Sequence, residues 1–244
     1  MHDAHAHFSQ EIVDLQSQHQ IPSLYSVDSP KQLRIIQEHG LDYSIGVHPW
    51  NASIQFLEEM MPLLENAQII GEIGMDSVWC DNDLNVQKEV FTRQIAYAAS
   101  AHKPVVLHTK GQEKEILDIL SQYPNTYFVH WYSCLDYVDD YNEVASYFSV
   151  GPSIGKDEAV TQLVKRIPIE KLLLESDGID AIEWAIQSRD YLGALQHTIE
   201  TIAQIKSLSI AETEKILDQN FKRLMQQEIN KHTKIQSQSW LDFF

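Results

Sequence analysis

The chain has 244 residues, of which 43% are hydrophobic and 22% charged, as expected of a protein with a sizeable buried core. Its 18 basic and 35 acidic residues give a net charge of −17, which argues against a broad basic groove for duplex binding. A nucleic-acid end could still reach a metal-lined pocket, because bound cations dominate the charge around them.

Eight short apolar runs predict eight β-strands, each followed by a longer segment. In chain order they are Met1–His7, Ser23–Val27, Tyr43–Val47, Gln68–Ile73, Pro104–His108, Thr126–His130, Tyr147–Val150 and Lys171–Glu175. Several of the segments between and after these runs carry apolar residues at helical intervals. The predicted helices are Pro30–Gly40, Asp83–Ala101, Gln112–Gln122, Lys156–Arg166, Ala181–Leu208 and Ala211–Glu228.

Strands that alternate with helices indicate parallel β-α units. Eight units match a TIM-type (β/α)8 barrel, and the length fits one α/β domain spanning residues 1–244. An open doubly wound sheet would give a similar pattern, so both architectures remain open at this point. The tail at 232–244 contains Trp240, Leu241, Phe243 and Phe244, which either cap the barrel or dock loosely.

The cellular context is predicted from features at the start of the chain and from its cysteines. The first residues show neither a basic start nor an apolar run, so we expect no signal peptide. No apolar stretch reaches the roughly 20 residues needed to cross a membrane. Cys80 and Cys134 form no Cys-x-x-Cys pair, which suggests a reducing compartment. We therefore expect a cytoplasmic protein.

Polar residues that commonly bind metals recur at the carboxyl ends of the predicted strands. They are His5, His7, His48, Glu72, Asp76, His108, His130 and Asp177. Active-site groups of a β/α barrel come from that end of the strands. The distribution therefore predicts an active site there.

His5 and His7 are two residues apart, so on a strand their side chains point to the same face while Ala6 points away. Two imidazoles so placed can hold one cation. An isolated pair is explained equally well as two structural histidines, since histidine is a common polar residue at such a rim. The other candidate ligands at strand ends favour the metal.

The other candidates each have a structural explanation when taken alone. A carboxylate such as Glu72 after an apolar strand is costly to bury unless it is paired or metal-bound, but it could also be a helix cap or a surface acid. His108 and His130 could form hydrogen bonds in the core, and Asp177 repeats the logic of Glu72. Together with the histidine pair they supply four imidazoles and two carboxylates, which suit zinc, manganese or iron better than calcium.

Five short stretches, spread over most of the chain, form a specific set. They are Asp3-Ala4-His5-Ala6-His7, Gly46-Val47-His48-Pro49-Trp50, Gly71-Glu72-Ile73-Gly74-Met75-Asp76, Pro104-Val105-Val106-Leu107-His108 and Leu172-Leu173-Leu174-Glu175-Ser176-Asp177. In this order the set resembles the TatD-related metal-dependent deoxyribonucleases, a family of amidohydrolase-like barrels. The resemblance implies a TIM-type barrel, a one- or two-metal site and hydrolysis of phosphodiester bonds in DNA.

The resemblance also implies roles for the candidate ligands. By this likeness one metal is held by His5, His7 and Asp177, a second by His108 and His130, and Glu72 bridges the two. The chain departs from the family pattern at Trp131-Tyr132-Ser133-Cys134, at Gly178-Ile179-Asp180, at Thr109-Lys110-Gly111 and at Ser77. These differences spare the ligands and alter the pocket rim, so they bear on the substrate more than on the chemistry.

The ligand set predicts hydrolysis by a metal-activated water, with one or two divalent ions of zinc, manganese or magnesium. Asp177 is placed to accept the proton of the water while it contacts a metal, and Glu72 is the second catalytic carboxylate. Lys110 and His48 are expected to contact the phosphate, although a solvated lysine and a loop histidine explain them equally well. Trp50, Trp79 and Trp131 could stack on a base or simply pack in loops.

Three functions fit these observations. The first is a deoxyribonuclease that acts on DNA ends, because a terminal phosphodiester needs few basic contacts. The second is a metallohydrolase of a small amide, lactone or phosphoester, which the acidic net charge and altered rim favour. The third, a metal-binding barrel without catalysis that serves as an interaction protein, conflicts with the complete ligand set. We expect no membrane partner, and the sequence makes no prediction of the oligomeric state.

Overall fold

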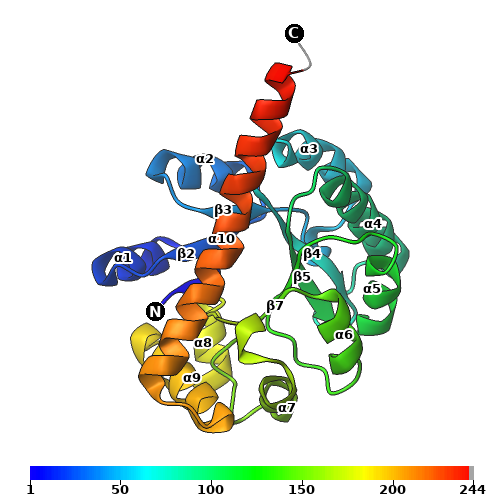
Figure 1. The fold of residues 1–244 in the computed structure, drawn as a ribbon. Coiled ribbons are helices and arrows are strands. Elements are labelled where there is room, and N and C mark those ends of the chain that lie inside the picture. Colours follow the sequence, from blue (N-terminus) through cyan, green and yellow to red (C-terminus); the bar gives the residue numbers. More distant parts are fainter. Residues whose placement is uncertain (242–244) are drawn as a thin grey trace.

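The computed structural model describes the backbone of residues 1–241 and the side chains of residues 1–226. Eight parallel strands follow one another around a single sheet in sequence order (Figure 1). They are β1 (Asp3–His7), β2 (Ser23–Val27), β3 (Tyr43–Ile45), β4 (Ile69–Asp76), β5 (Val105–Lys110), β6 (Tyr127–Val129), β7 (Tyr147–Val150) and β8 (Leu172–Leu174).

The first and last strands meet where the barrel closes. Ala6 of β1 forms an isolated bridge with Asp177, which follows β8, and the Asp177 amide donates to the His5 carbonyl at 3.0 Å. The predicted TIM-type (β/α)8 barrel is therefore confirmed, and the doubly wound alternative is wrong.

Helices cover the outside of the barrel (Figure 1). They are α1 (Gln10–His19), α2 (Pro30–His39), α3 (Ile54–Leu64), α4 (Leu84–Ser100), α5 (Glu113–Leu120), α6 (Val138–Val144), α7 (Glu158–Arg166), α8 (Ile179–Ile186), α9 (Tyr191–Lys206) and α10 (Ile210–Leu241). Two short 3-10 helices lie in the connections: η1 (Pro49–Asn51) between β3 and α3, and η2 (Ile169–Lys171) between α7 and β8. Helix α2 has its proline in the first turn and ends at Gly40, with φ of 64°, as the sequence predicts.

One predicted helix is wrong in its extent. The segment 181–208 forms two helices, because Gln187 takes a left-handed backbone with φ of 56° and ends α8. Asp190 then caps α9 by accepting a hydrogen bond from the Gly193 amide. The predicted C-terminal helix at 211–228 extends to Leu241.

Two strands are longer than the sequence predicts, which changes the position of site residues. Glu72 lies inside β4, and Asp76 is the last residue of that strand. Likewise His108 lies within β5, which continues to Lys110. The pairing of β4 with β5 continues to Asp76 and Lys110, so the carboxyl end of the sheet is extended at these two strands.

The pairing shifts register at two places that carry candidate ligands. Between Asp3 and Ala6 the chain of β1 advances three residues while β2 advances two, from Ser23 to Tyr25. The same shift occurs on β4 between Ile70 and Ile73, opposite Val105 and Leu107. Such bulges redirect side chains, and His5 and Glu72 lie within these irregular segments.

The amino-terminal end of the barrel is filled by a compact apolar cluster. It contains one residue from most strands together with two from α10: Ala4, Leu24, Ile69, Val106, Phe128, Tyr147, Leu173, Phe221 and Leu224. Figure 1 shows α10 crossing this end of the barrel. Phe221 and Leu224, early in α10, thus cover the end of the barrel, whereas Trp240 and Leu241 lie in its last turn. Phe243 and Phe244 lie outside the described residues.

A larger cluster packs the outer faces of the strands against the surrounding helices. Within residues 1–241, no helix combines the length and the apolar character needed to cross a membrane.

Candidate metal centre

Glu72 lies at the centre of the candidate site, and its two carboxylate oxygens face different histidines. Its Oε2 atom is 3.3 Å from His5 Nε2 and 3.5 Å from His7 Nε2. Its Oε1 atom is 2.7 Å from His108 Nδ1 and 3.5 Å from His130 Nε2. One carboxylate therefore connects two groups of imidazoles, one from β1 and the other from β5 and the residue after β6.

Asp177 completes the group around Oε2. Its Oδ1 atom lies 3.5 Å from the Nε2 atoms of both His5 and His7. The potential ligand atoms of these three residues lie within 4.8 Å of one another, and so do those of His5, Glu72 and His130. The structure brings all six predicted metal ligands together, as expected for residues at the carboxyl ends of parallel barrel strands.

The polar atoms around Oε2 fit a cation. His5 Nε2, Glu72 Oε2 and Asp177 Oδ1 are buried, and none has a hydrogen-bond partner among the residues that the structure describes. Buried polar atoms without partners are costly, and here imidazole nitrogen and carboxylate oxygen converge on one position. This donor set matches zinc, manganese or iron, so the residues present fit a divalent metal.

A buried carboxylate orients His130 from behind. The His130 Nδ1 atom donates to Glu175 Oε2 at 3.0 Å, and the Ser149 hydroxyl donates to the same oxygen at 2.6 Å. The bond to Glu175 places the hydrogen of the neutral ring on Nδ1. The Nε2 atom, which faces Glu72, then keeps a free lone pair. Carboxylates in this position fix the tautomer of histidines that bind metals.

Asp76 holds the other side of the centre and the adjoining loop. It accepts hydrogen bonds from His108 Nε2 at 3.0 Å and from the Trp50 indole at 2.8 Å. The amides of Val78 and Trp79 also donate to it at 2.8 Å. The same carboxylate therefore orients a candidate ligand and anchors two tryptophans of the rim.

His48 lies with the metal-ligand candidates and does not line the cavity, which differs from the rim position expected from the sequence. Its Nε2 atom is 3.5 Å from Glu72 Oε1, and its Nδ1 atom accepts a hydrogen bond from the Trp50 amide at 3.2 Å. Because Nδ1 is an acceptor, the hydrogen of the neutral ring lies on Nε2 and points to Glu72. This geometry suits a hydrogen-bond donor to Glu72.

The two central carboxylates are ionised at neutral pH. Burial alone would raise the pKa of Glu72, but its interactions with the imidazoles of His130, His48 and His5 outweigh burial and hold the pKa well below its usual range. Burial would likewise raise the pKa of Asp177, and the neighbouring histidines lower it. Both candidate ligands are therefore anionic, and Asp177 is able to accept a proton.

Two histidines of the site, His108 and His130, hold a proton more readily than a free imidazole does. Burial lowers the pKa of His108, but hydrogen bonds to Asp76 and Glu72 outweigh it and raise the pKa to about 9. For His130, burial also lowers the pKa, and the negative charge of Glu175 raises it above its ordinary value. A metal that binds these nitrogens must displace protons, so metal affinity should rise with pH.

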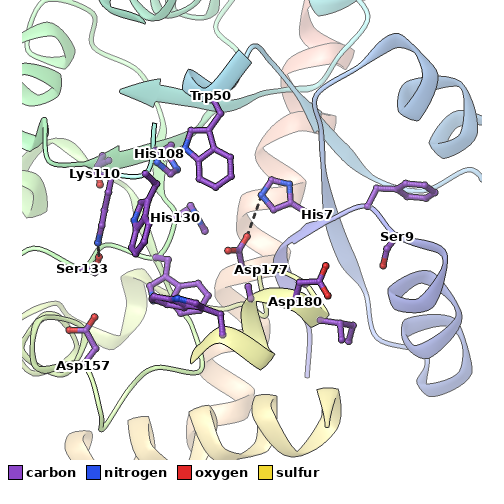
Figure 2. Close-up of a pocket in the computed structure, with 18 of the residues that line it drawn as sticks. His7, Ser9, Trp50, His108, Lys110, His130, Ser133, Asp157, Asp177 and Asp180 are labelled. Carbon is purple, nitrogen blue, oxygen red and sulfur yellow. Dashed lines mark hydrogen bonds and ion pairs between the residues drawn. The ribbon is translucent and has the colours of Figure 1, made fainter. Parts of the chain in front are cut away.

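A cavity of about 620 Å³ opens from the centre to the surface. His7, Asp177 and Asp180 lie on one side of it, and His108, His130 and Lys110 lie on the other (Figure 2). Four tryptophans line it: Trp50, Trp79, Trp131 and Trp184. The size fits a nucleotide or another small molecule.

The charged residues of the cavity are mostly acidic. Glu11, Asp157, Asp177 and Asp180 line it, and Lys110 is the one lysine or arginine among its described lining residues. The Lys110 ammonium donates to the Ser133 hydroxyl at 2.8 Å and lies 5.9 Å from the centre of the Trp79 ring. Among the described lining residues, Lys110 is thus the one lysine or arginine that can contact an anionic group of a substrate.

Several residues of the site carry no role in the sequence prediction. Glu175 comes straight after the apolar strand Leu172–Leu174, and a carboxylate in that position is the sequence signal for it. Trp184 lies on α8, in the first turn of the helix predicted at 181–208, and nothing in the sequence places it at the rim. The sequence places Asp76 at a strand end but predicts no role for it.

Imidazoles and carboxylates converge at the carboxyl ends of the strands of a (β/α)8 barrel. This fold and site together define the class of protein, a metal-dependent hydrolase. Comparison with known families specifies it further, because residues 2–226 match the family described as TatD related DNase. The chain belongs to this family.

Individual relatives and solved structures agree with this assignment. The chain is 25% identical to the uncharacterized metal-dependent hydrolase YabD of Bacillus subtilis, over 91% of this chain and 97% of that protein. It is 27% identical to the human deoxyribonuclease TATDN3, over 74% and 72% of the two chains. The crystal structure of YjjV, a TatD homologue from Escherichia coli, matches the fold with a TM-score of 0.76 at 19% identity, covering 91% and 96%.

Proposed function

We propose that this chain hydrolyses phosphodiester bonds at DNA ends, with one or two divalent metal ions of zinc, manganese or magnesium. The proposed ligands are His5, His7, Glu72, His108, His130 and Asp177. The observation that carries the proposal is the position of Glu72, whose two oxygens face two separate groups of histidines. When bound, a divalent metal supplies Lewis acidity and a water molecule that is nucleophilic near neutral pH.

The residues of the chain take distinct parts in this chemistry. Asp177 is ionised and next to both histidines of β1, so it accepts the proton of the attacking water. Glu72 bridges the two ligand groups and neutralises their charge. Lys110 approaches the phosphate from the rim, and His48 orients Glu72 from the side as a donor.

Attack at an end fits the charge of the protein. The net charge of −17 and the acidic cavity lining leave little attraction for a long backbone. A terminal phosphodiester needs the metals and one or two contacts from the protein. We also propose a cytoplasmic location, which the two free cysteines, Cys80 and Cys134, support.

A second candidate function is hydrolysis of a small phosphoester, amide or lactone. The observation that favours it is the ratio of four carboxylates to one lysine in the cavity lining. A small neutral or singly charged substrate meets less repulsion there than a polynucleotide does.

Digestion of end-labelled linear DNA beside a closed circular plasmid tests the proposal, with Mg²⁺, Mn²⁺ and Zn²⁺ supplied in turn. The linear DNA should shorten progressively while the circle survives. Asp177→Asn should lower the rate by orders of magnitude, because a proton acceptor and a charged ligand are lost together. His197→Ala, an exposed change on α9, should leave the rate unchanged.

Two results would contradict end-directed cleavage. Nicking of the circle at a comparable rate would show internal attack. Turnover of a small ester or amide, with both DNA substrates intact, would move the function to the second candidate.

A further inference from the structure

Three tryptophans gather at the mouth of the cavity on separate segments of the chain. The rings of Trp79 and Trp184 are 5.8 Å apart between centres and almost perpendicular, at 88°. The rings of Trp131 and Trp184 are 6.4 Å apart, at 68°. Trp184 thus lies in contact with both of the others, and we call these three residues the tryptophan cluster.

Two of the three tryptophans of the cluster are exposed although they are strongly apolar. Trp184 is 67% exposed and Trp79 is 54% exposed, and the adjacent Val78 is also exposed. Large contiguous apolar patches are uncommon on soluble proteins and mark binding sites. The cluster lies beside the candidate metal centre, because the Trp131 ring is 6.4 Å from that of His130.

Trp131 is fixed in place at a cost to the backbone. Its backbone φ is 34°, in the left-handed region that residues other than glycine rarely adopt. Its ring lies against Gly151, where an added Cβ atom would come within 2.6 Å of the indole. Its indole N–H donates to the Ser153 hydroxyl at 3.0 Å, and its amide donates to the Ser149 hydroxyl at 3.2 Å. Such positioning on a strained backbone is typical of functional sites.

The charges around the cluster limit what can bind to it. Lys110 is 5.9 Å from the Trp79 ring and can pair with one phosphate. Asp157 and Asp180 line the same cavity and disfavour further anionic groups. The surroundings therefore suit a flat, uncharged ring system that is attached to a single phosphate.

We propose that the tryptophan cluster is a stacking site for the unpaired nucleobase next to the scissile phosphodiester. This inference rests on the proposed function and names the part of the substrate that gives it affinity. Stacking on an indole is tolerant of base identity, because every base has an aromatic face. It requires little positive charge, which matches the low number of basic residues at the rim.

Cleavage of matched oligonucleotides tests the stacking site. One single-stranded oligonucleotide is complete, and two others carry an abasic residue at the terminal or the penultimate position. On the complete substrate, Trp184→Ala should lower kcat/KM by about 5- to 150-fold, the range expected for loss of one stacked base. Trp184→Phe should lower kcat/KM less than Trp184→Ala does. Ile210→Ala, which changes an exposed apolar residue on α10, should leave kcat/KM unchanged.

The abasic substrates separate stacking from other effects of the substitution. With the abasic residue at the stacked position, kcat/KM of the wild-type protein should fall to the value that Trp184→Ala has on the complete substrate. On this abasic substrate, Trp184→Ala should not lower kcat/KM further. Full activity of Trp184→Ala on the complete substrate would overturn the proposal. An equal loss on all three substrates would overturn it as well.

A binding measurement in chelator distinguishes this proposal from the proposed function. The complete oligonucleotide should quench tryptophan fluorescence in the wild-type protein, and the quenching should weaken several-fold in Trp184→Ala. If this holds while no oligonucleotide is cleaved with any metal, the stacking site stands and the nuclease function fails. If the oligonucleotide causes no quenching, or quenches both proteins equally, the stacking site fails.

Discussion

The position of Glu72 depends on the glycines on either side of it. A Cβ atom at Gly71 would lie 2.6 Å from the Val106 carbonyl oxygen, and one at Gly74 would lie 1.9 Å from the His108 carbonyl oxygen. Both contacts are with the backbone of β5, so any larger residue would push the two strands apart. The Gly-x-x-Gly spacing around Glu72 therefore serves the close approach of β5, which carries His108 to the same centre.

Glu175→Gln should weaken metal binding although Glu175 is not itself a proposed ligand. The amide keeps the shape of the side chain but removes the charge that holds the hydrogen on His130 Nδ1. We expect a loss of about 10- to 100-fold in metal affinity, as for other partners of metal-binding histidines. Competition with a chromogenic chelator measures it, and a circular dichroism spectrum checks the fold.

Glu170→Gln is the matched control, because it makes the same chemical change on an exposed residue of η2, five positions earlier in the chain. It should leave the affinity unchanged. Equal affinities for wild type and Glu175→Gln would show that the carboxylate does not act on the metal through His130.

At the scale of the elements, all eight strands are present where apolar runs predict them, because a buried parallel strand is apolar along its whole length. The helices were harder to predict. α1 buries only Ile12, Val13 and Gln16, so its apolar stripe is short, and α6 buries only Val138 and Tyr141. α3 contains Pro62, which argues against a helix in isolation. Tertiary packing stabilises these three helices.

His2 makes the junction of β1, β8 and α10 sensitive to acid. It is buried; its Nε2 atom accepts a hydrogen bond from the Leu174 amide at 3.1 Å, and its Nδ1 atom donates to Asp218 at 2.9 Å. Burial lowers the pKa of His2 below its ordinary 6.5, against the raising effect of Asp218. The unfolded chain then binds more protons than the folded one below pH 6.5, so this contribution to stability is lost as the pH falls through that value.

We expect His2→Gln to flatten the pH dependence of the free energy of unfolding between pH 7 and pH 5. Protonation of His2 removes a hydrogen bond from a buried amide, which costs about 1–3 kcal/mol, and glutamine does not titrate. Urea unfolding at several pH values measures the difference between the two proteins. Parallel curves for wild type and variant would show that His2 does not contribute to the acid sensitivity.

At the scale of the whole molecule, the sequence predicts the grouping of the six ligand candidates because the barrel gathers the carboxyl ends of all its strands. It could not predict which oxygen of Glu72 faces which histidine, since this depends on the bulges in β1 and β4. Nor could it place Trp184, because the contact with Trp79 joins α8 to the loop after β4.

Removal of metal should destabilise the entire barrel. The proposed ligands come from β1, β4, β5 and the segments after β6 and β8, so a bound metal ties together opposite sides of the sheet. At a free concentration 100 times Kd, binding to the folded state adds about 2.7 kcal/mol to the free energy of unfolding. Thermal unfolding with added Zn²⁺, Mn²⁺ or Mg²⁺ and with chelator should show a higher Tm in metal.

Glu72→Gln should lose most of this shift in Tm, whereas His197→Ala should retain it. A Tm that is the same with metal and with chelator for the wild-type protein would contradict metal binding at these residues.

The cluster around Phe221 and Leu224 plugs the barrel at the end opposite the cavity. A polynucleotide therefore cannot pass through the barrel, and its terminus enters and leaves on the side of the cavity. Each released fragment leaves on the same side of the protein as the strand that remains. For a nuclease with this fold, the strand has to move out of the cavity before the fragment leaves, which favours distributive over processive shortening.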